Sequence, residues 1–430
     1  MENIRRFSTA AAGAAVACLL ASNVQASGGV DEQMLLELKK MIEQQQQQLD
    51  RQASEIANLK EQLGGTSKAL DKKVDKEELE KLDTGSMITS RFEHVDVNLY
   101  GQINKGVLWS DDGNSSKAYF VDNSNSQSRL GLNASVSPRE GFSVGGKIEY
   151  GIKSNATSDV SQLDANGATS VNWNLRHADL FFNSTTMGKL SLGYGSSASD
   201  GTAEVDFSGT DVVTYSEISD FAGGQYFYDN SQDTLSEVRV KNVYSNMDGL
   251  GRDDRLRYDT PSFAGFSVAA SAVSGDAYDT ALRYSRSFGD TKVAAAIAWA
   301  SPGDVREAVD NQYDGSVSVL FGNGLNATLA AGSRDLTEDG RDDPTFWYGK
   351  LGYRLDIWSL GKTSFSIDYA QNDDLSRDGD EAKSWSVAAV QDIPAWGTEI
   401  YLAFRNHELD GTVESYDSVN SVLGGARVKF

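Results

Sequence analysis

The sequence predicts an all-β transmembrane antiparallel β-barrel of about 16 strands, preceded by an α-helical coiled-coil segment. Three observations lead to this prediction. The N-terminus has the pattern of an export segment, apolar and polar residues alternate over most of residues 95–430, and the turns between the alternating segments are short in some places and long and acidic in others.

The composition agrees with this fold and excludes some functions. A formal net charge of -23 argues against nucleic acid as a partner, and it suits either attraction of cations or solubility. After the N-terminus no run of about 18 apolar residues occurs, so we expect no membrane-spanning helix. A barrel strand faces lipid with alternate residues only, so its average composition resembles that of a soluble protein.

Residues 1–26 have the pattern of a signal peptide. Arg5 and Arg6 precede an apolar stretch, and Val24-Gln25-Ala26 forms a small-residue cleavage site. Cleavage there removes Cys18, the only cysteine, so the exported chain needs no oxidant to fold. A membrane anchor and lipidation at Cys18 are the alternatives, but the stretch is short for a span and the residues before Cys18 match a lipidation site weakly.

Residues 27–90 are expected to form a periplasmic helical segment. Within residues 31–63, apolar residues and two glutamines recur at spacings of three and four, over four heptads, which predicts a coiled coil. The alternative is a single amphipathic helix that packs on a domain, which the polar remainder of its surface disfavours. The predicted core positions are Leu35, Leu38, Ile42, Gln45, Leu49, Gln52, Ile56, Leu59 and Leu63.

Residues 91–430 are expected to form the barrel. Segments such as LNATLAA, SFSIDYA and EIYLAFR alternate, and residues 98–430 allow about 20 residues for each strand and its loop. A soluble β-sandwich or solenoid would show the same alternation in any single strand, so the number of strands and the export segment favour the barrel. Aromatic residues near strand ends are predicted to mark the membrane interfaces: Trp109, Trp299, Tyr100 and Tyr353.

The chain ends on GGARVKF, in which every second residue back from Phe430 is apolar or small. In a closed barrel this last strand must pair with the first, because lipid tolerates no open strand edge. We therefore expect Phe430 in the aromatic girdle on the periplasmic side.

Several segments resemble the Gram-negative general porins. NLYGQINKGV resembles the family's opening strand, DDRLRYDTPSFAGFSVAASA resembles its NSVRYDSPSFGGFSFSA segment, and GGARVKF resembles its GxRHKF ending, a recognition feature for outer-membrane assembly. The resemblance implies a 16-stranded homotrimer in the outer membrane of a Gram-negative bacterium, in contact with the lipid bilayer and lipopolysaccharide, with a third external loop folded into the lumen. The coiled coil departs from the ordinary family pattern.

The long insert at residues 197–237 holds nine carboxylates and no basic residue. Its segment Asp220-Phe221-Ala222-Gly223-Gly224 resembles the E-F-G-G motif of the family's constriction loop, and a carboxylate ring in a narrow pore attracts cations. We expect two or three of the nine to line the pore. The candidates are Glu204, Asp206, Asp211, Glu217 and Asp220.

A basic wall is expected to face this insert. Side chains alternate between the two faces of a strand, and this alternation is expected to point Arg129, Arg255 and Arg257 toward the lumen. Arg176 is ambiguous, because it lies at the same alternate positions as apolar residues of its own strand. Lys105 lies on the same face as apolar residues of the first strand, so we expect it at a subunit contact.

We therefore predict a porin for passive diffusion of small hydrophilic solutes and ions, with a preference for cations. The alternatives are a channel specific for a sugar or an anion on the same fold, and a tether whose coiled coil contacts peptidoglycan. No phosphate loop, metal-ligand cluster or nucleophile motif occurs, so we expect no enzyme and no cofactor; His177 is more often structural in such a position. The acidic runs at 111 and 376 offer calcium ligands without the EF-hand pattern.

Overall fold

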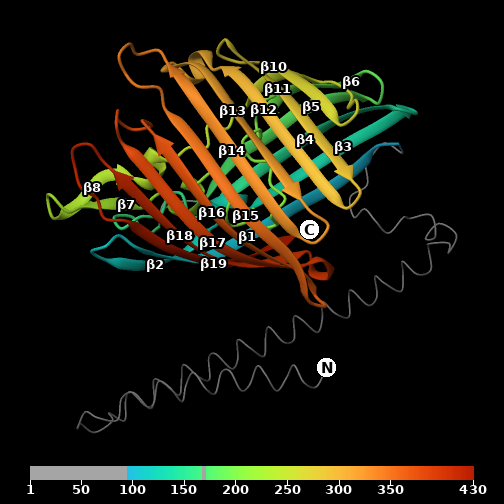
Figure 1. Ribbon diagram of the computed structural model, residues 1–430. Helices are drawn as coiled ribbons and strands as arrows, with labels where there is room; N and C mark the ends of the chain where they lie inside the picture. The colour runs from blue at the N-terminus through green and yellow to red at the C-terminus, as the bar shows by residue number, and fades with distance from the viewer. Residues whose placement is uncertain (1–93, 167–170) are drawn as a thin grey trace, which may run out of the picture. The chain divides into compact units, whose positions relative to one another are not determined.

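The computed structural model describes residues 94–166 and 171–430 (Figure 1). The signal peptide expected at 1–26 and the coiled coil expected at 27–90 lie outside the described residues. Within the described ranges, no helix combines the length and the apolar character needed to cross a bilayer.

Sixteen antiparallel strands of the described chain close into one barrel, as the sequence predicts. Almost every strand pairs with its neighbour in the chain, which is the arrangement that hairpins produce. The ring strands are β1 (Asp96–Asp111), β3 (Arg129–Arg139), β4 (Phe142–Lys153), β5 (Asn172–Ser184), β6 (Gly188–Ser196), β9 (Arg252–Asp259), β10 (Phe266–Val273), β11 (Ala277–Phe288), β12 (Thr291–Ser301), β13 (Val309–Leu320), β14 (Leu325–Leu336), β15 (Thr345–Trp358), β16 (Gly361–Asp373), β17 (Glu381–Ile393), β18 (Thr398–Asp410) and β19 (Val419–Lys429).

The first and last strands close the ring. β19 pairs with β1 from Gln102 to Asp111, and the chain end continues the ladder: Gly101 N donates to Phe430 O at 2.8 Å and Phe430 N donates to Gly101 O at 3.0 Å. The expected pairing of the first and last strands is therefore confirmed. A side chain at Gly101 would collide with the Phe430 ring, so this position requires glycine.

One strand is interrupted beside β1. β2 (Ser116–Asp122) pairs with the half of β1 that leads to the long loops, and β3 pairs with the other half. Between them lies the short 3-10 helix η1 (Ser124–Ser126), whose first turn is capped by the side chain of Asn123. The wall of the barrel therefore contains a local break at this point.

The outer surface of the barrel is apolar and the inner surface is polar. Ile297, Leu351 and Leu402 expose 60%, 60% and 58% of their surface, whereas inward-facing Ser318 and Ser386 are fully covered. A soluble sandwich would bury the apolar row, and exposed apolar surface of this extent marks contact with another apolar phase. The alternation that the sequence shows thus points the apolar side chains outward, toward lipid.

Exposed aromatic residues gather at both ends of this apolar belt. Trp109, Trp299 and Trp347 lie toward the long loops, and Tyr353 and Phe430 lie toward the short turns. The prediction for Tyr100 is wrong. Its ring turns inward and covers Gly131, and its hydroxyl donates to Glu149 Oε2 at 2.6 Å, because residue 100 shares its parity with the polar inner face.

Candidate functional site

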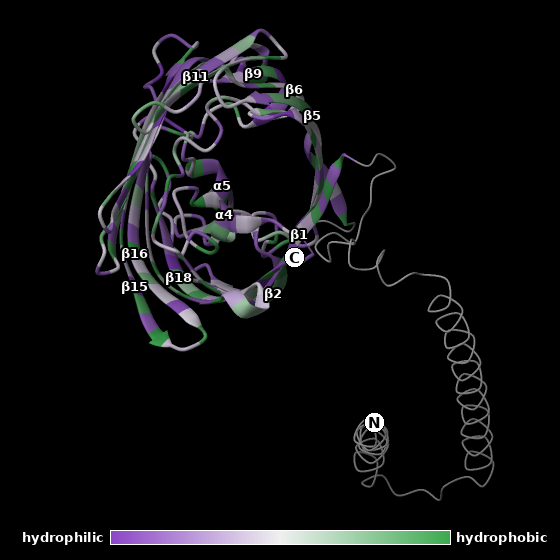
Figure 2. Ribbon diagram, turned by 90° about the vertical axis from the view of Figure 1, so that its right-hand side faces the viewer, coloured by the Kyte–Doolittle hydropathy of each residue, from purple (hydrophilic) through white to green (hydrophobic). Residues whose placement is uncertain are grey.

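The segment between β6 and β9, residues 197–251, folds into the barrel and not away from it. Figure 2 shows its two short helices, α4 (Ser219–Ala222) and α5 (Val240–Val243), inside the ring of strands. Between these helices the segment forms a hairpin of β7 (Tyr226–Asp229) and β8 (Thr234–Arg239). We call residues 197–251 the inner loop.

Polar side chains of the barrel wall hold the backbone of the inner loop. The amides of Val205 and Phe207 donate to the hydroxyls of Ser316 and Ser318 on β13, at 2.9 and 3.0 Å. Farther along the loop, the Tyr244 hydroxyl donates to backbone oxygens of β17 and β18. Because backbone groups out of contact with water must be paired, the hydroxyls of Ser316 and Ser318 take the place of a strand partner for the loop, and the Tyr244 hydroxyl adds a contact from the loop to the wall.

A fully buried lysine fixes the centre of the inner loop. Lys350 on β15 reaches Asp206 Oδ2 at 2.7 Å, and it also donates to Ser208 Oγ at 3.2 Å, Thr210 Oγ1 at 3.1 Å and Thr214 O at 2.6 Å. Burial alone would raise the pKa of Asp206, but the Lys350 ammonium outweighs it and lowers that pKa. Four contacts from one cation leave the loop little freedom here.

Apolar packing fills the space between the inner loop and the wall formed by β14–β19 and β1. Loop side chains such as Phe221, Phe227 and Met247 are fully buried, and they belong to two clusters that include wall residues such as Tyr348 and Leu423. Each such side chain contributes about 1.5–3 kcal/mol on burial. The loop is therefore a packed inner wall, and the open part of the lumen lies on the side of β3–β10.

The predicted acidic residues occupy different environments. Glu204 and Asp211 are exposed, and Glu217 and Asp220 are partly exposed. Glu217 accepts from the Ser219 hydroxyl at 2.6 Å and from the Asn246 amide at 3.2 Å, whereas Asp220 accepts from the Tyr215 hydroxyl. The side chain of Asp206 is only 5% exposed and serves the ion pair with Lys350.

Asn246 joins two of these acidic side chains. Its side-chain amide donates to Glu204 Oε1 at 3.0 Å while its backbone amide donates to Glu217. Desolvation within the packed loop raises the pKa of Glu217 to about 7, and the negative charge of Asp220 adds to this rise. Glu217 is therefore partly ionised at neutral pH.

Ion pairs with strand carboxylates hold the predicted basic residues on the opposite wall. Arg176 pairs with Glu149 at 2.6 Å, and Arg129 lies 4.0 Å from the same carboxylate. Lys147 approaches it at 3.5 Å. One carboxylate thus holds three cations in a fixed cluster on β3–β5.

The remaining two arginines lie on β9. Arg255 pairs with Asp179 at 2.6 Å and its side chain is only 3% exposed, whereas Arg257 pairs with Asp259 at 2.6 Å and is more open to the lumen. Their shared parity places both on the inner face, together with their partners.

A β-bulge explains why the parity of Arg176 was ambiguous. Glu149 pairs with His177 and Tyr150 pairs with Leu175, so Arg176 is the extra residue of the bulge. The bulge reverses the alternation within β5. It turns Arg176 toward Glu149 although Leu180 and Phe182, at the same spacing in the sequence, face outward.

Sequence reasoning missed the buried residues that support the inner loop. Arg405 on β18 forms a buried ion pair with Asp368 on β16 at 3.0 Å, and its guanidinium lies 5.7 Å from the centre of the Phe221 ring. Lys350 and Arg405 both occupy inward positions on strands in which polar and apolar residues alternate. Charge at an inward position was the available signal, but it does not tell a loop anchor from a pore-lining group.

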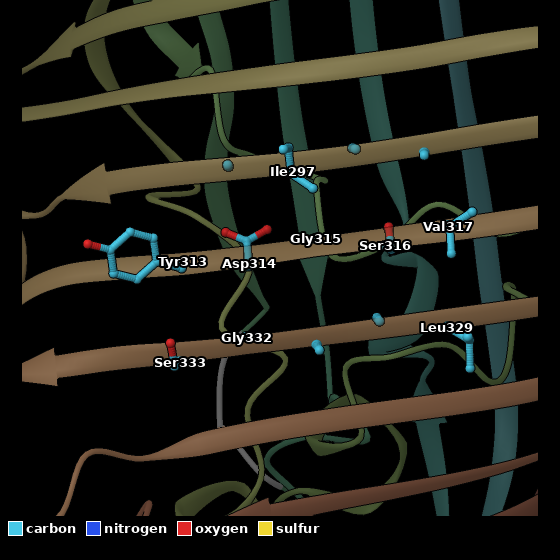
Figure 3. A pocket seen from close by; sticks show the side chains of 14 residues that line it. Ile297, Tyr313, Asp314, Gly315, Ser316, Val317, Leu329, Gly332 and Ser333 are labelled. Carbon is cyan, nitrogen blue, oxygen red and sulfur yellow. The ribbon is translucent and has the colours of Figure 1, made fainter.

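A hollow of about 770 Å³ on β12–β14 belongs to the outer surface (Figure 3). The exposed side chains of Ile297, Val317 and Leu329 border it, and small residues at Gly315 and Ala331 form its floor. Its walls are mainly apolar, and it continues the apolar belt. We therefore do not assign the functional site to it.

The described histidines give no support to catalysis. The buried Nδ1 of His177 has no hydrogen-bond partner among the described residues, and His407 is fully buried with its Nδ1 3.4 Å from the carbonyl of Val419. Within the same part of the chain, no group of three His, Cys, Asp or Glu side chains is arranged to hold a metal ion. The candidate functional groups are the fixed charges on the two sides of the lumen.

Comparisons with known proteins agree with this architecture. The family described as Gram-negative porin matches residues 85–412. No curated protein matches the chain.

Solved structures show the same fold at low sequence identity. The anion-selective porin from Comamonas acidovorans aligns with a TM-score of 0.52 and 15% identity, over 78% of this chain and 100% of that one. The loop L8 deletion mutant of OmpT, from Vibrio cholerae, aligns with a TM-score of 0.50 and 15% identity, over 79% and 100%. The trimer form of OmpT aligns with a TM-score of 0.50 and 14% identity, over 79% and 100%.

Proposed function

The chain belongs to the Gram-negative porin family and is an outer-membrane channel, and we propose that small hydrophilic solutes and ions diffuse passively through it with a preference for cations. The passage lies between the inner loop and the wall of β3–β10. No step of chemistry is required, because fixed charges and pore width determine what passes.

The observation that carries the cation preference is the charge of the inner loop. Glu204, Asp211, Glu217 and Asp220 all retain exposed surface in the lumen, and residues 197–237 contain no basic residue. The opposite arginines are held against the wall by ion pairs with Glu149, Asp179 and Asp259. The carboxylates of the inner loop therefore form a negative side of the passage, and this side raises the local concentration of cations.

The proposed preference depends on side chains and not on the fold. The porin from Comamonas acidovorans has the same fold and is described as anion-selective. The barrel architecture therefore does not by itself require a preference for cations. A test must change the loop charge and keep the barrel.

The experiment is a planar-bilayer recording of reversal potentials in a salt gradient at pH 8. The double variant Glu217→Gln/Asp220→Asn should lower the cation-over-anion permeability ratio, because screening limits charge effects to about 8 Å and these groups lie in the passage. The control is Glu338→Gln/Asp339→Asn, an exposed pair in the loop after β14. A larger effect of this outer pair, or no shift from either pair, would refute the assignment.

We further propose that the coiled coil expected at residues 31–63 tethers the channel to peptidoglycan. Residues 31–63 carry a seam of four heptads, and 33 helical residues reach about 50 Å. Deleting residues 31–82 should leave the conductance unchanged and reduce the fraction of protein that co-sediments with peptidoglycan. Unchanged co-sedimentation would rule out the tether and leave the channel role intact.

A further inference from the structure

A second cavity, of about 680 Å³, lies on the open wall opposite the inner loop. Its lining comes from inward positions of β1, β3–β6 and β9. In the strand register, Asn98 lies beside Asn133, Asn133 beside Lys147, and Lys147 beside Asp179. The volume is in the usual range for small-molecule sites.

Among the described residues, the charges around this cavity include one ammonium with no carboxylate partner. Arg255 is paired with Asp179 and Arg257 with Asp259, and Lys147 shares the carboxylate of Glu149 with Arg176 and Arg129. Lys189, at the start of β6, is exposed and forms no ion pair with a described residue. The cavity therefore has an excess of positive charge, and it suits a solute that carries a carboxylate.

An aromatic ring lies next to this free ammonium. A side chain at Gly145 would collide with the Phe181 ring, so the absence of a Cβ there lets the ring lie against the wall. Lys189 Nζ lies over the ring, 5.0 Å from its centre. A carboxylate bound to Lys189 would thus hold the attached ring of a solute beside Phe181.

The remaining polar groups of the cavity are free to bind hydroxyls. The side chains of Asn98, Asn133, Ser135 and Ser191 make no hydrogen bond to another described residue. Carboxamides and hydroxyls both donate and accept, so they can pair with a solute hydroxyl in either role. A site of this composition recognises several hydroxyl groups and one anionic group.

We propose that this cavity is a binding subsite for sugar acids, that is, hydroxylated rings that carry one carboxylate. Lys189 pairs with the carboxylate, Phe181 contacts the apolar face of the ring, and Asn133 and Ser135 bind hydroxyls. This inference rests on the proposed diffusion channel and not on its preference for cations, and it specifies one class of solute that binds within the lumen. A neutral sugar lacks the partner for Lys189, and an aromatic acid lacks the hydroxyls.

The test uses the full-length protein in a planar bilayer, with galacturonate, glucose and benzoate added as probes. Galacturonate should interrupt the single-channel current in a concentration-dependent manner, and glucose and benzoate should do so more weakly at equal concentration. The variant Lys189→Gln should weaken the galacturonate effect by about fivefold, because it removes a charge-assisted contact. Phe181→Ala should weaken it for all ring probes.

The matched control is Lys292→Gln, which removes the same charge from an exposed lysine at the start of β12, outside the cavity lining. It should leave the galacturonate effect unchanged. A channel that conducts without interruption by galacturonate, or equal effects of the two lysine variants, would overturn the subsite and leave the proposed channel intact. Absence of any ion current would instead overturn the channel function.

Discussion

Single side chains of the inner loop determine how the channel responds to pH. The pKa of Glu217 is raised to about 7 by desolvation, with the charge of Asp220 adding to the rise. The ionised form therefore prevails at pH 8 and the neutral form at pH 6. Because the pKa in the folded loop exceeds the ordinary value, protonation favours the folded loop, and acidification over this range does not loosen it.

We predict that the cation preference of the wild-type channel falls as the pH drops from 8 to 6. Reversal potentials measured at both pH values check this. The isosteric variant Glu217→Gln should have the lower preference already at pH 8 and should change less between the two values. An equally steep pH dependence in the variant would show that another group titrates.

Lys350 is the second residue with a testable role. Lys350→Met should detach the middle of the inner loop, since removing one partner of a buried ion pair costs about 3–5 kcal/mol. The barrel should stay folded, as judged by its heat-modifiable mobility in gels, while current noise and protease cleavage within residues 200–215 increase. The double variant Lys350→Met/Asp206→Leu should restore a quiet channel, because it leaves no buried unpaired charge.

If the double variant is as noisy as the single one, the loop depends on the hydrogen bonds of Lys350 to Ser208, Thr210 and Thr214 O and not on charge balance. The pair of Lys350 and Asp206 also shows how far single residues could be predicted from the sequence. The resemblance to the constriction loop predicts Asp206 in the lumen, and the alternation along β15 is consistent with an inward Lys350. Neither observation can tell that they meet, because 144 residues separate them in the chain.

At the scale of elements, the strands can be predicted because every strand of a barrel must alternate apolar residues toward lipid with polar residues toward the lumen. The pattern fails where the strand itself is irregular. The bulge at Arg176 shifts the parity within β5, whereas the break at η1 separates β2 from β3 and leaves Phe120 and Leu130 on the same outer face. Neither irregularity has a glycine or proline that would reveal it in the sequence. The position of the inner loop depends on packing between distant segments, which no local pattern contains.

The closing strand gives the prediction at this scale. Deleting Phe430 should deplete the protein from the outer membrane, because the residue completes the ladder with Gly101 and places its ring in the aromatic girdle. Quantitative blots of outer-membrane fractions measure the loss. Phe430→Tyr keeps both the ladder and an aromatic ring and should assemble normally. Wild-type levels of the deletion variant would contradict the role.

For the whole molecule, Lys105 indicates which face of the barrel is covered. It points outward from β1 with 49% of its side chain exposed, and it is bonded to Asp122 at 2.6 Å and Ser154 Oγ at 2.9 Å. Along β1 it lies midway between Gly101, which pairs with Phe430, and Trp109, so its depth is the centre of the apolar belt. A lysine facing lipid at this depth costs about 2–4 kcal/mol.

A neighbouring subunit removes this cost, and the small residues Gly424 and Ala426 beside Lys105 allow close approach. We therefore predict that the β1–β19 face forms the contact between protomers of a trimer. The charge-free variant Lys105→Met/Asp122→Asn should lower the temperature at which trimers dissociate in native gels. If this face met lipid instead, removing a charge from the hydrocarbon would stabilise the barrel and leave the dissociation temperature of the trimer unchanged, so the two arrangements predict different results.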